Sequence, residues 1–386
     1  MSDWRDEVRQ DYEEFKKRLR DTTLKDFQSG GWFAEFVQWL LQNYAKTVDA
    51  AYIRRNYPGL HPANQARKAI TLAARHNAIA GGTAAAAITG LELSSIGPQA
   101  VVTVPAVATL VLADVAYCTR TQLRSTYDLS IIHGAPLSLD DVEDCYLVFL
   151  TAMGVKLYEL AGSLGKAVGP KVVVYNVRRL LRTGLRRALQ EVLQRVGGAR
   201  LARALTERAM MRLLVPGINV PIATGMNYYF TRQILNVANE QMTKRGAVVQ
   251  PLIRLYKREP NLDKMVAPKI LITIGDSGDP EGWSEGQMGA LRHCQSTLSL
   301  DDGDLARLDA YFDRTVNDIV QEIPPLLGNS VDDVLDLAIV LAALATDDRH
   351  DIVYAETIVQ LAGHLGTILS TSEVIAKIRQ KRRRLS

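Results

Sequence analysis

The chain has 386 residues, of which 47% are hydrophobic and 6% aromatic, and its formal net charge is +4. A chain of this length is long for a single core and predicts two or three domains. Because strand-favouring aromatic residues are sparse, we expect an all-α fold made of multi-helix bundles. The three cysteines lie far apart without CxxC spacing. This excludes a disulfide framework and a simple zinc site, and it fits a reducing compartment.

Charge is distributed unevenly along the chain. Residues 61–260 contain 24 Lys and Arg against 12 Asp and Glu. Residues 271–375 contain 4 against 19, and residues 376–386 add six cations and no acid. Such changes of sign indicate separate domains. The basic part could face phospholipid, nucleic acid or the acidic part of the same chain.

The N-terminal residues predict two charged helices. Apolar side chains recur at helical spacing through 1–28, and 32–53 is rich in aromatic residues. The high charge of the first residues argues against a signal peptide. The sequence NYPGLHPAN at 56–64 predicts a turn-rich boundary, so the first part of the chain is expected to span 1–60.

A central segment rich in glycine, alanine and proline follows. The sequence predicts a helix over 64–90 and then a stretch of 21 uncharged residues over 93–113. That stretch contains Gly97, Pro98 and Pro105 and is about long enough to span a membrane; the alternative is a buried helical hairpin in a soluble bundle. A further helix is expected from Ala113 until Gly134 ends it.

Residues 171–212 contain eleven Lys and Arg against two Glu, with apolar residues at steps of three and four. This pattern predicts a basic amphipathic helix that could bind anionic lipid or an acidic partner. The candidate binding residues are Arg178, Arg179, Arg182, Arg186, Arg187 and Arg195. A solvated face, or one covered by the acidic domain, fits the same pattern. Nucleic acid is not expected, because Tyr175 is the only aromatic residue there and no known binding module is visible.

The stretch LLVPGINVPIATGMNYYFTRQ at 213–233 has no charge from Leu213 to Thr231. Prolines and glycines interrupt it, so it predicts an apolar hairpin limb with a corner at Pro216 and Gly217 rather than a simple spanning helix. The candidate membrane-contact residues are Val215, Pro216, Gly217, Pro221 and Gly225. The alternative is that this stretch packs against protein.

The acidic region after Pro260 predicts a second bundle of helices separated by acid-rich loops. The expected helices are 284–298, 302–322, 331–345, 351–369 and 372–384.

Two segments resemble known families. The run HNAIAGGTAAAAITG and the sequence VPGINVPIATGMNYYFTRQILNVANEQM resemble parts of EcsC-family domains, and the resemblance covers 65–245. It implies a helical, bacterial, membrane-associated domain without an accepted reaction. Residues 265–375, around TDDRHDIVYAE, are similar to TerB-like domains of the tellurite-resistance type. That similarity implies another helical bundle and a stress-response role.

Catalytic and metal-binding motifs are weak or absent in the sequence. Hydrolase, phosphate-binding-loop, zinc-protease and dinucleotide-binding motifs are missing, so we expect neither an enzyme nor a cofactor. The best metal-ligand cluster is Asp347, Asp348, His350 and Asp351.

Three polar residues, Asp114, His76 and His133, lie in otherwise apolar surroundings, and we expect each to have a structural role. Asp114 is unusual in an apolar helix and is expected to tether it to another helix. A hydrolase with an unrecognised site would need a pocket joining Asp114 to His76 or His133, which we instead expect to be core or cap histidines.

These patterns predict three parts, at 1–60, 65–245 and 265–386, the last with a basic tail. We expect a non-enzymatic, membrane-associated accessory or stress-response protein, cytoplasmic or peripheral at the inner membrane. Its expected partners are an anionic membrane surface and possible proteins, without nucleic acid or a small-molecule substrate. The alternative is a cytoplasmic interaction scaffold whose acidic and basic domains pair.

Overall fold

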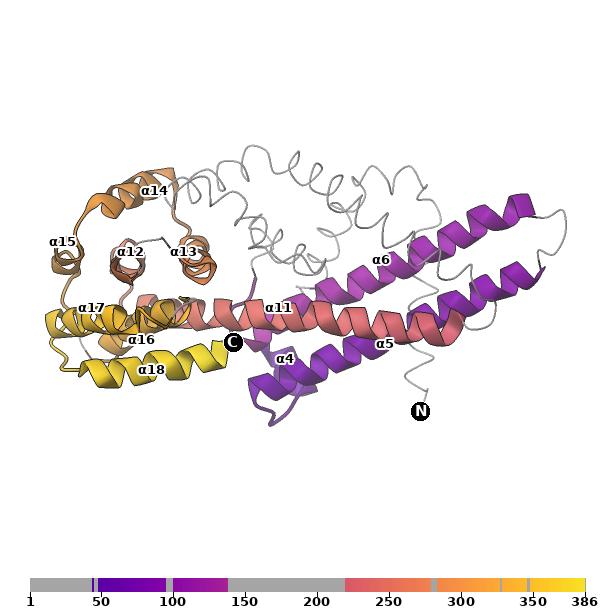
Figure 1. Ribbon diagram of the computed structural model, residues 1–386, viewed down its shortest axis with the longest axis horizontal. Coiled ribbons are helices and arrows are strands. Elements are labelled where there is room, and N and C mark those ends of the chain that lie inside the picture. Colours follow the sequence, from indigo (N-terminus) through magenta and orange to yellow (C-terminus); the bar gives the residue numbers. More distant parts are fainter. Residues whose placement is uncertain are drawn as a thin grey trace. The chain divides into compact units, whose positions relative to one another are not determined.

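The computed structural model describes residues 44, 48–94, 100–137, 219–278, 283–326, 328–345 and 348–385. All regular secondary structure in these ranges is helical (Figure 1), so the all-α prediction is confirmed. The chain forms two compact units, and helix α11 contributes residues to both of them.

The first unit is built from long helices. Its described elements are α4 (Ala50–Asn56), α5 (Pro62–Ser94), α6 (Ala100–Ile132) and the first half of α11 (Asn219–Arg258). Asp49 begins α4 by accepting a hydrogen bond from the backbone N–H of Tyr52 at 2.6 Å. The turn that follows contains Gly59 with φ of 68°, and Pro62 opens α5 at a position that suits proline. The predicted turn is confirmed, and the helices on either side of it, α4 and α5, belong to the same compact unit.

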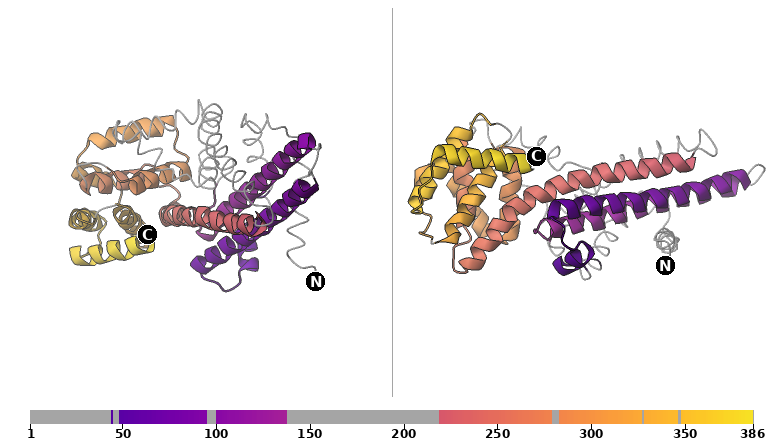
Figure 2. Two further views of the ribbon diagram at one scale, coloured as in Figure 1. Left: turned by 45° about the vertical axis from the view of Figure 1, so that its right-hand side comes forward. Right: turned by 90° about the horizontal axis from the view of Figure 1, so that it is seen from below.

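Helices α5 and α6 pack along each other (Figures 1 and 2). Small side chains recur at steps of three and four on the buried face of α5, where they allow close approach of the two backbones. The buried alanines of α5 are Ala66, Ala69, Ala73, Ala74, Ala78, Ala80, Ala84 and Ala85. This spacing explains how an alanine-rich sequence with few large apolar residues still forms a packed helical pair.

The start of α6 corrects the sequence-based expectation. The helix begins at Ala100 instead of Ala113, and it runs through Pro105. Proline removes one backbone donor, but here it does not end the helix. Gly134 follows the helix with φ of 69°, a conformation that favours glycine. The predicted end is therefore confirmed.

Helix α11 corrects a second expectation. We expected prolines and glycines to break the chain over 213–231, but α11 continues from Asn219 through Pro221 and Gly225 to Arg258. Pro221 lies in the first turn, where a backbone N–H has no partner within the helix. The predicted corner at Pro216 and Gly217 lies outside the described residues.

Helix α12 (Val266–Gly278) lies inside the second unit (Figure 1), and eleven of its residues are buried. Leu252 and Leu255 from the second half of α11 join the same core. The other elements are α13 (Glu285–Thr297), α14 (Asp302–Asp309), η2 (Ala310–Asp313), α15 (Val316–Gln321), α16 (Asn329–Ala343), α17 (Asp351–His364) and α18 (Thr371–Leu385).

Local capping sets many of these boundaries. Ser284 and Gln287 form a capping box at the start of α13. The predicted helix 302–322 is wrong, because the chain there forms α14, η2 and α15. Thr315 begins α15 by accepting a hydrogen bond from the N–H of Asp318, so the helical run is interrupted just before it.

Replacement of Gly278 tests the packing around α12. A Cβ atom there would lie 2.0 Å from Cζ of Tyr354, which is 1% exposed. We expect Gly278→Ala to lower the free energy of unfolding by about 1–3 kcal/mol, because the buried ring must shift. Urea unfolding would measure the change.

Gly363 provides a matched control on α17, the helix that carries Tyr354. A Cβ atom at Gly363 would meet nothing within 4 Å. Gly363→Ala should be neutral or stabilising. Equal losses of stability in the two variants would contradict the packing role of Gly278.

Candidate functional site

The residues predicted to contact lipid fall into two groups. The arginines of 171–212 and Val215, Pro216 and Gly217 lie outside the part of the chain that the structure describes. Pro221 and Gly225 lie in α11, where Gly225 is exposed. The candidate surface must therefore be judged from α11 and from the second unit.

An exposed aromatic pair lies on α11, within the stretch that carries no charge. Tyr229 is 58% exposed and Phe230 is 38% exposed. Their rings meet edge to face with centroids 5.9 Å apart. The side-chain amide of Gln233 donates a hydrogen bond to the Tyr229 hydroxyl at 2.6 Å. The pair is held in place on the surface and offers a partly apolar contact area.

Another face of α11 is buried and polar. The amide of Asn227 donates to the carboxylate of Asp114 on α6 at 3.0 Å and to the backbone oxygen of Asn77 on α5 at 3.2 Å. The amide of Asn77 donates in turn to the hydroxyl of Thr231 at 2.8 Å. Asp114 is fully buried. Its predicted role as a tether between helices is confirmed.

The two histidines considered as bases do not share a compact unit. His76 is partly buried on α5 in the first unit. His133 lies in the turn after α6, which belongs to the second unit. There Nε2 of His133 lies 3.4 Å from the hydroxyl of Thr243, and its backbone oxygen accepts a hydrogen bond from Gln250 at 2.6 Å. His133 is therefore partly buried and in contact with Thr243 and Gln250.

Sequence reasoning missed a titratable carboxyl at Asp128. The Tyr44 hydroxyl lies 3.0 and 3.1 Å from the two carboxyl oxygens, and the Arg124 guanidinium lies 4.9 Å from the Tyr44 ring centroid. Burial raises the pKa of Asp128 to about 7, against the lowering effects of Tyr44 and Arg124. No motif marks this site, because Tyr44 and Asp128 are 84 residues apart.

Acidic side chains of α16 are paired with basic ones from two other helices. Asp333 is 4% exposed and accepts hydrogen bonds from Arg254, at 2.7 Å, and from Arg258, both on α11. Asp336 accepts from Arg254 at 3.3 Å and from Lys381 on α18 at 2.7 Å. The basic end of α11 and the basic tail therefore neutralise the same acidic helix.

Asp351, one of the metal candidates, is instead an ion-pair acceptor. It is 1% exposed, and its two oxygens receive hydrogen bonds from Arg382 at 2.7 and 3.1 Å. Arg379 adds a contact of 3.3 Å. Arg382 also donates to the backbone oxygens of Ala342 and Ala343 at the end of α16. Two arginines thus bind the start of α17 to α18.

The described metal candidates, Asp348 and His350, do not form a metal-binding group with Asp351. Asp348 is exposed, and His350 directly precedes α17. Asp347 lies outside the described residues. Within the described ranges, no group of three or more His, Cys, Asp or Glu side chains is arranged to hold a metal ion.

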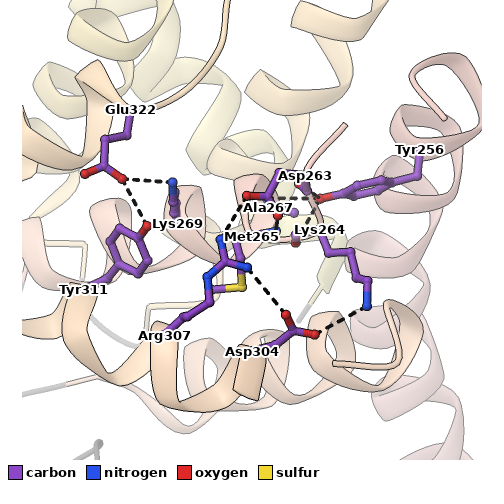
Figure 3. A network of polar contacts seen from close by, with 10 residues as sticks. All are labelled: Tyr256, Asp263, Lys264, Met265, Ala267, Lys269, Asp304, Arg307, Tyr311 and Glu322. Atoms are coloured by element: carbon purple, nitrogen blue, oxygen red, sulfur yellow. Dashed lines mark hydrogen bonds and ion pairs between the residues drawn. The ribbon is translucent and has the colours of Figure 1, made fainter. Parts of the chain in front are cut away.

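A third polar network crosses the face of α12 (Figure 3). Lys269, only 6% exposed, donates to Glu322 at 3.0 Å and lies 4.7 Å from the ring centroid of Tyr311. The Tyr311 hydroxyl donates to the same carboxylate at 3.0 Å. Burial alone lowers the pKa of Lys269, but Tyr311 and Glu322 outweigh it and the pKa is raised. Lys269 is therefore a buried, ion-paired cation, and its raised pKa favours the protonated form.

The second half of this network joins the turn before α12 to α14. Asp263 accepts a hydrogen bond from Arg307 at 3.2 Å, and Asp304 pairs with Lys264 at 3.4 Å (Figure 3). The Tyr256 hydroxyl donates to backbone oxygens in the same turn, at Asp263 and Lys264. These contacts connect α11, the turn before α12 and α14.

Asp128 predicts a distinctive pH dependence. Because its pKa is about 7 in the folded protein and 3.8 ordinarily, the folded state retains a proton that the unfolded state releases between these values. Its contribution to stability is full below pH 4 and is lost as the pH rises through 7. Relative to that of Asp128→Asn, the free energy of unfolding of the wild type should fall by up to about 1.4 kcal/mol for each pH unit between these two pKa values.

Urea unfolding of both proteins between pH 5 and 8 would measure this difference. The asparagine keeps the size of the side chain and does not titrate, so other carboxyl groups cancel in the comparison. Parallel stability curves for the two proteins would contradict a raised pKa at Asp128.

Comparisons of the chain with protein-family models, curated proteins and solved structures found no match. The resemblances to EcsC-family and TerB-like domains therefore stay predictions. In the part of the chain that the structure describes, no helix is long and apolar enough to cross a membrane.

Proposed function

We propose that the chain is a non-enzymatic accessory protein that makes reversible, peripheral contact with an anionic membrane surface. The observation that carries this proposal is the exposed pair Tyr229 and Phe230 on α11. The Tyr229 ring with its polar hydroxyl suits the boundary between lipid headgroups and acyl chains, and Phe230 adds apolar area beside it. A helix can bind at this boundary without spanning the bilayer.

Charge supports the same proposal. Arg232 is exposed on α11, next to the aromatic pair. Residues 171–212, with eleven cations against two acids, would add attraction to anionic lipid of about 1 kcal/mol for each cation near the surface. The predicted arginines between Arg178 and Arg195 are included in this proposal only because of their sequence pattern. The EcsC and stress-response expectations are compatible with it and also remain proposals.

Substitution of the aromatic pair tests the proposal. Tyr229→Ser/Phe230→Ser should weaken cosedimentation with phosphatidylglycerol-containing vesicles at low salt by about 5- to 30-fold, because less apolar surface enters the interface. Ile253→Ser is a matched control, since Ile253 is 45% exposed on the same helix. Absence of wild-type binding to these vesicles at low salt would overturn the proposal.

A second candidate function is an interaction scaffold whose basic and acidic parts pair. The ion pairs of Arg254 and Arg258 with Asp333 support this candidate within the second unit, where basic residues at the end of α11 meet an acidic helix. In this case the second unit would serve as a rigid platform for a protein partner.

Asp333→Asn tests the pairing. We expect it to lower the free energy of unfolding by about 1–3 kcal/mol, since two half-exposed arginines lose a carboxylate that is largely buried. Stability of the variant should also depend less on salt than that of the wild type. Asp332→Asn is the control, because Asp332 directly precedes Asp333 in α16 and is exposed. Equal effects of the two substitutions would argue against the pairing.

A further inference from the structure

The C-terminal helix α18 is attached to the second unit by a narrow apolar stripe. Three of its fifteen residues are buried, against twelve of fifteen in α16. The apolar stripe consists of Val374, Ile378 and Leu385, at steps of four and seven, so its members lie on one face of the helix. They join the core of the unit, where α18 packs against α16 and α17 (Figure 1).

Ion pairs provide the other attachment of α18. Arg379 and Arg382 bind the carboxylate of Asp351 on α17, at 3.3 and 2.7 Å. Lys381 binds Asp336 on α16 at 2.7 Å. The side chains of these three cations are, in chain order, 56%, 24% and 21% exposed. Because each cation keeps contact with water, other anions can compete for it.

A detached α18 would be a basic amphipathic helix. It contains six Lys and Arg against one Glu, and its release would uncover the apolar stripe. In water, exposure of the stripe favours the docked state. An anionic membrane offers phosphate groups to the cations and an acyl layer to the stripe, so it replaces both kinds of contact at once.

We propose that α18 is a latched membrane anchor, which is docked on α16 and α17 in water and is released to bind an anionic lipid surface. The docked helix hides its apolar stripe, so lipid binds the released state more tightly and shifts the equilibrium toward it. Departure of α18 also opens the buried Asp351 to water, because Arg379 and Arg382 lie against its carboxylate. A nucleic acid or an acidic peptide would replace the ion pairs but leave the stripe in water.

This inference rests on the proposed membrane contact and adds a device that controls it. It concerns a helix different from α11, which carries the aromatic pair, and from the basic segment 171–212. The two claims can therefore fail separately.

The experiment weakens the latch without changing α18. Asp351→Asn removes the carboxylate that Arg379 and Arg382 share. Binding of the full chain to vesicles of phosphatidylcholine with phosphatidylglycerol should tighten by about 5- to 20-fold, because more of α18 is released. Trypsin should also cleave after Arg379 sooner than in the wild type. Circular dichroism would verify that the variant keeps its helices.

Asp332→Asn is the matched control. Asp332 is exposed on α16, and the ion pairs that α18 makes with Asp336 and Asp351 do not involve it. This variant loses the same negative charge but keeps the latch. Its vesicle binding should stay within about twofold of the wild type, and tryptic cleavage in α18 should be unchanged.

A second variant tests the apolar stripe. Ile378→Ser added to Asp351→Asn should remove the gain in vesicle binding, because a polar side chain at the centre of the stripe opposes entry into the acyl layer. Tryptic cleavage of α18 should remain fast in this double variant, since the helix is still released.

The outcomes separate the two claims. If the wild type binds anionic vesicles and Asp351→Asn binds no more tightly than Asp332→Asn, the latch is wrong while the proposed function stands. If neither the wild type nor Asp351→Asn binds, the proposed function fails and this inference fails with it. If the gain in binding survives Ile378→Ser, released α18 is a general polyanion-binding helix and the lipid assignment is overturned.

Discussion

The acidic helices of the second unit can pack only because cations from other helices neutralise their carboxylates. Asp333 and Asp351 are almost completely buried, and a buried carboxylate without a partner would cost several kcal/mol. The partners come from α11 and α18, on either side of the acidic segment in the sequence. The same contacts therefore bring distant parts of the chain together and define the orientation of α18.

This pairing also changes how the basic C-terminal tail is interpreted. Six cations in the last eleven residues suggest a tail that is available to any anion. In the structure, Lys381 and Arg382 are turned toward acidic helices, whereas Arg383 and Arg384 are exposed. One helix thus stabilises the fold with one side and presents charge with the other.

The first unit depends on a different interaction. Its helices are held by small side chains and by a buried polar network around Asp114 and Asn227. Hydrogen bonds within such a network require particular partners, so they select one alignment of α5, α6 and α11. A purely apolar interface of small residues would select the alignment less strongly. The polar face of α11 is buried for this reason, while Tyr229 and Phe230 are left exposed.

Part of the site could be anticipated from residue patterns, and part could not. The tethering role of Asp114 follows from one charge in an apolar helix, because a buried carboxylate needs a donor. The network around Asp128 gives no such signal, since its partner Tyr44 lies far away in sequence. Asp351 was grouped with Asp348 and His350 by proximity in the chain. Its actual partners are arginines of α18.

The sequence by itself determined the helical class and the helix ends that depend on local hydrogen bonds. Gly134 and the cap at Ser284 are examples, because turns and capping boxes involve residues only a few positions apart. Only the tertiary structure decided which charges are paired, which glycines face a ring and which apolar residues remain exposed. Gly278 beside Tyr354 and Asp351 beside Arg382 are contacts between separate helices. Such contacts depend on how whole helices pack, which no short segment of sequence specifies.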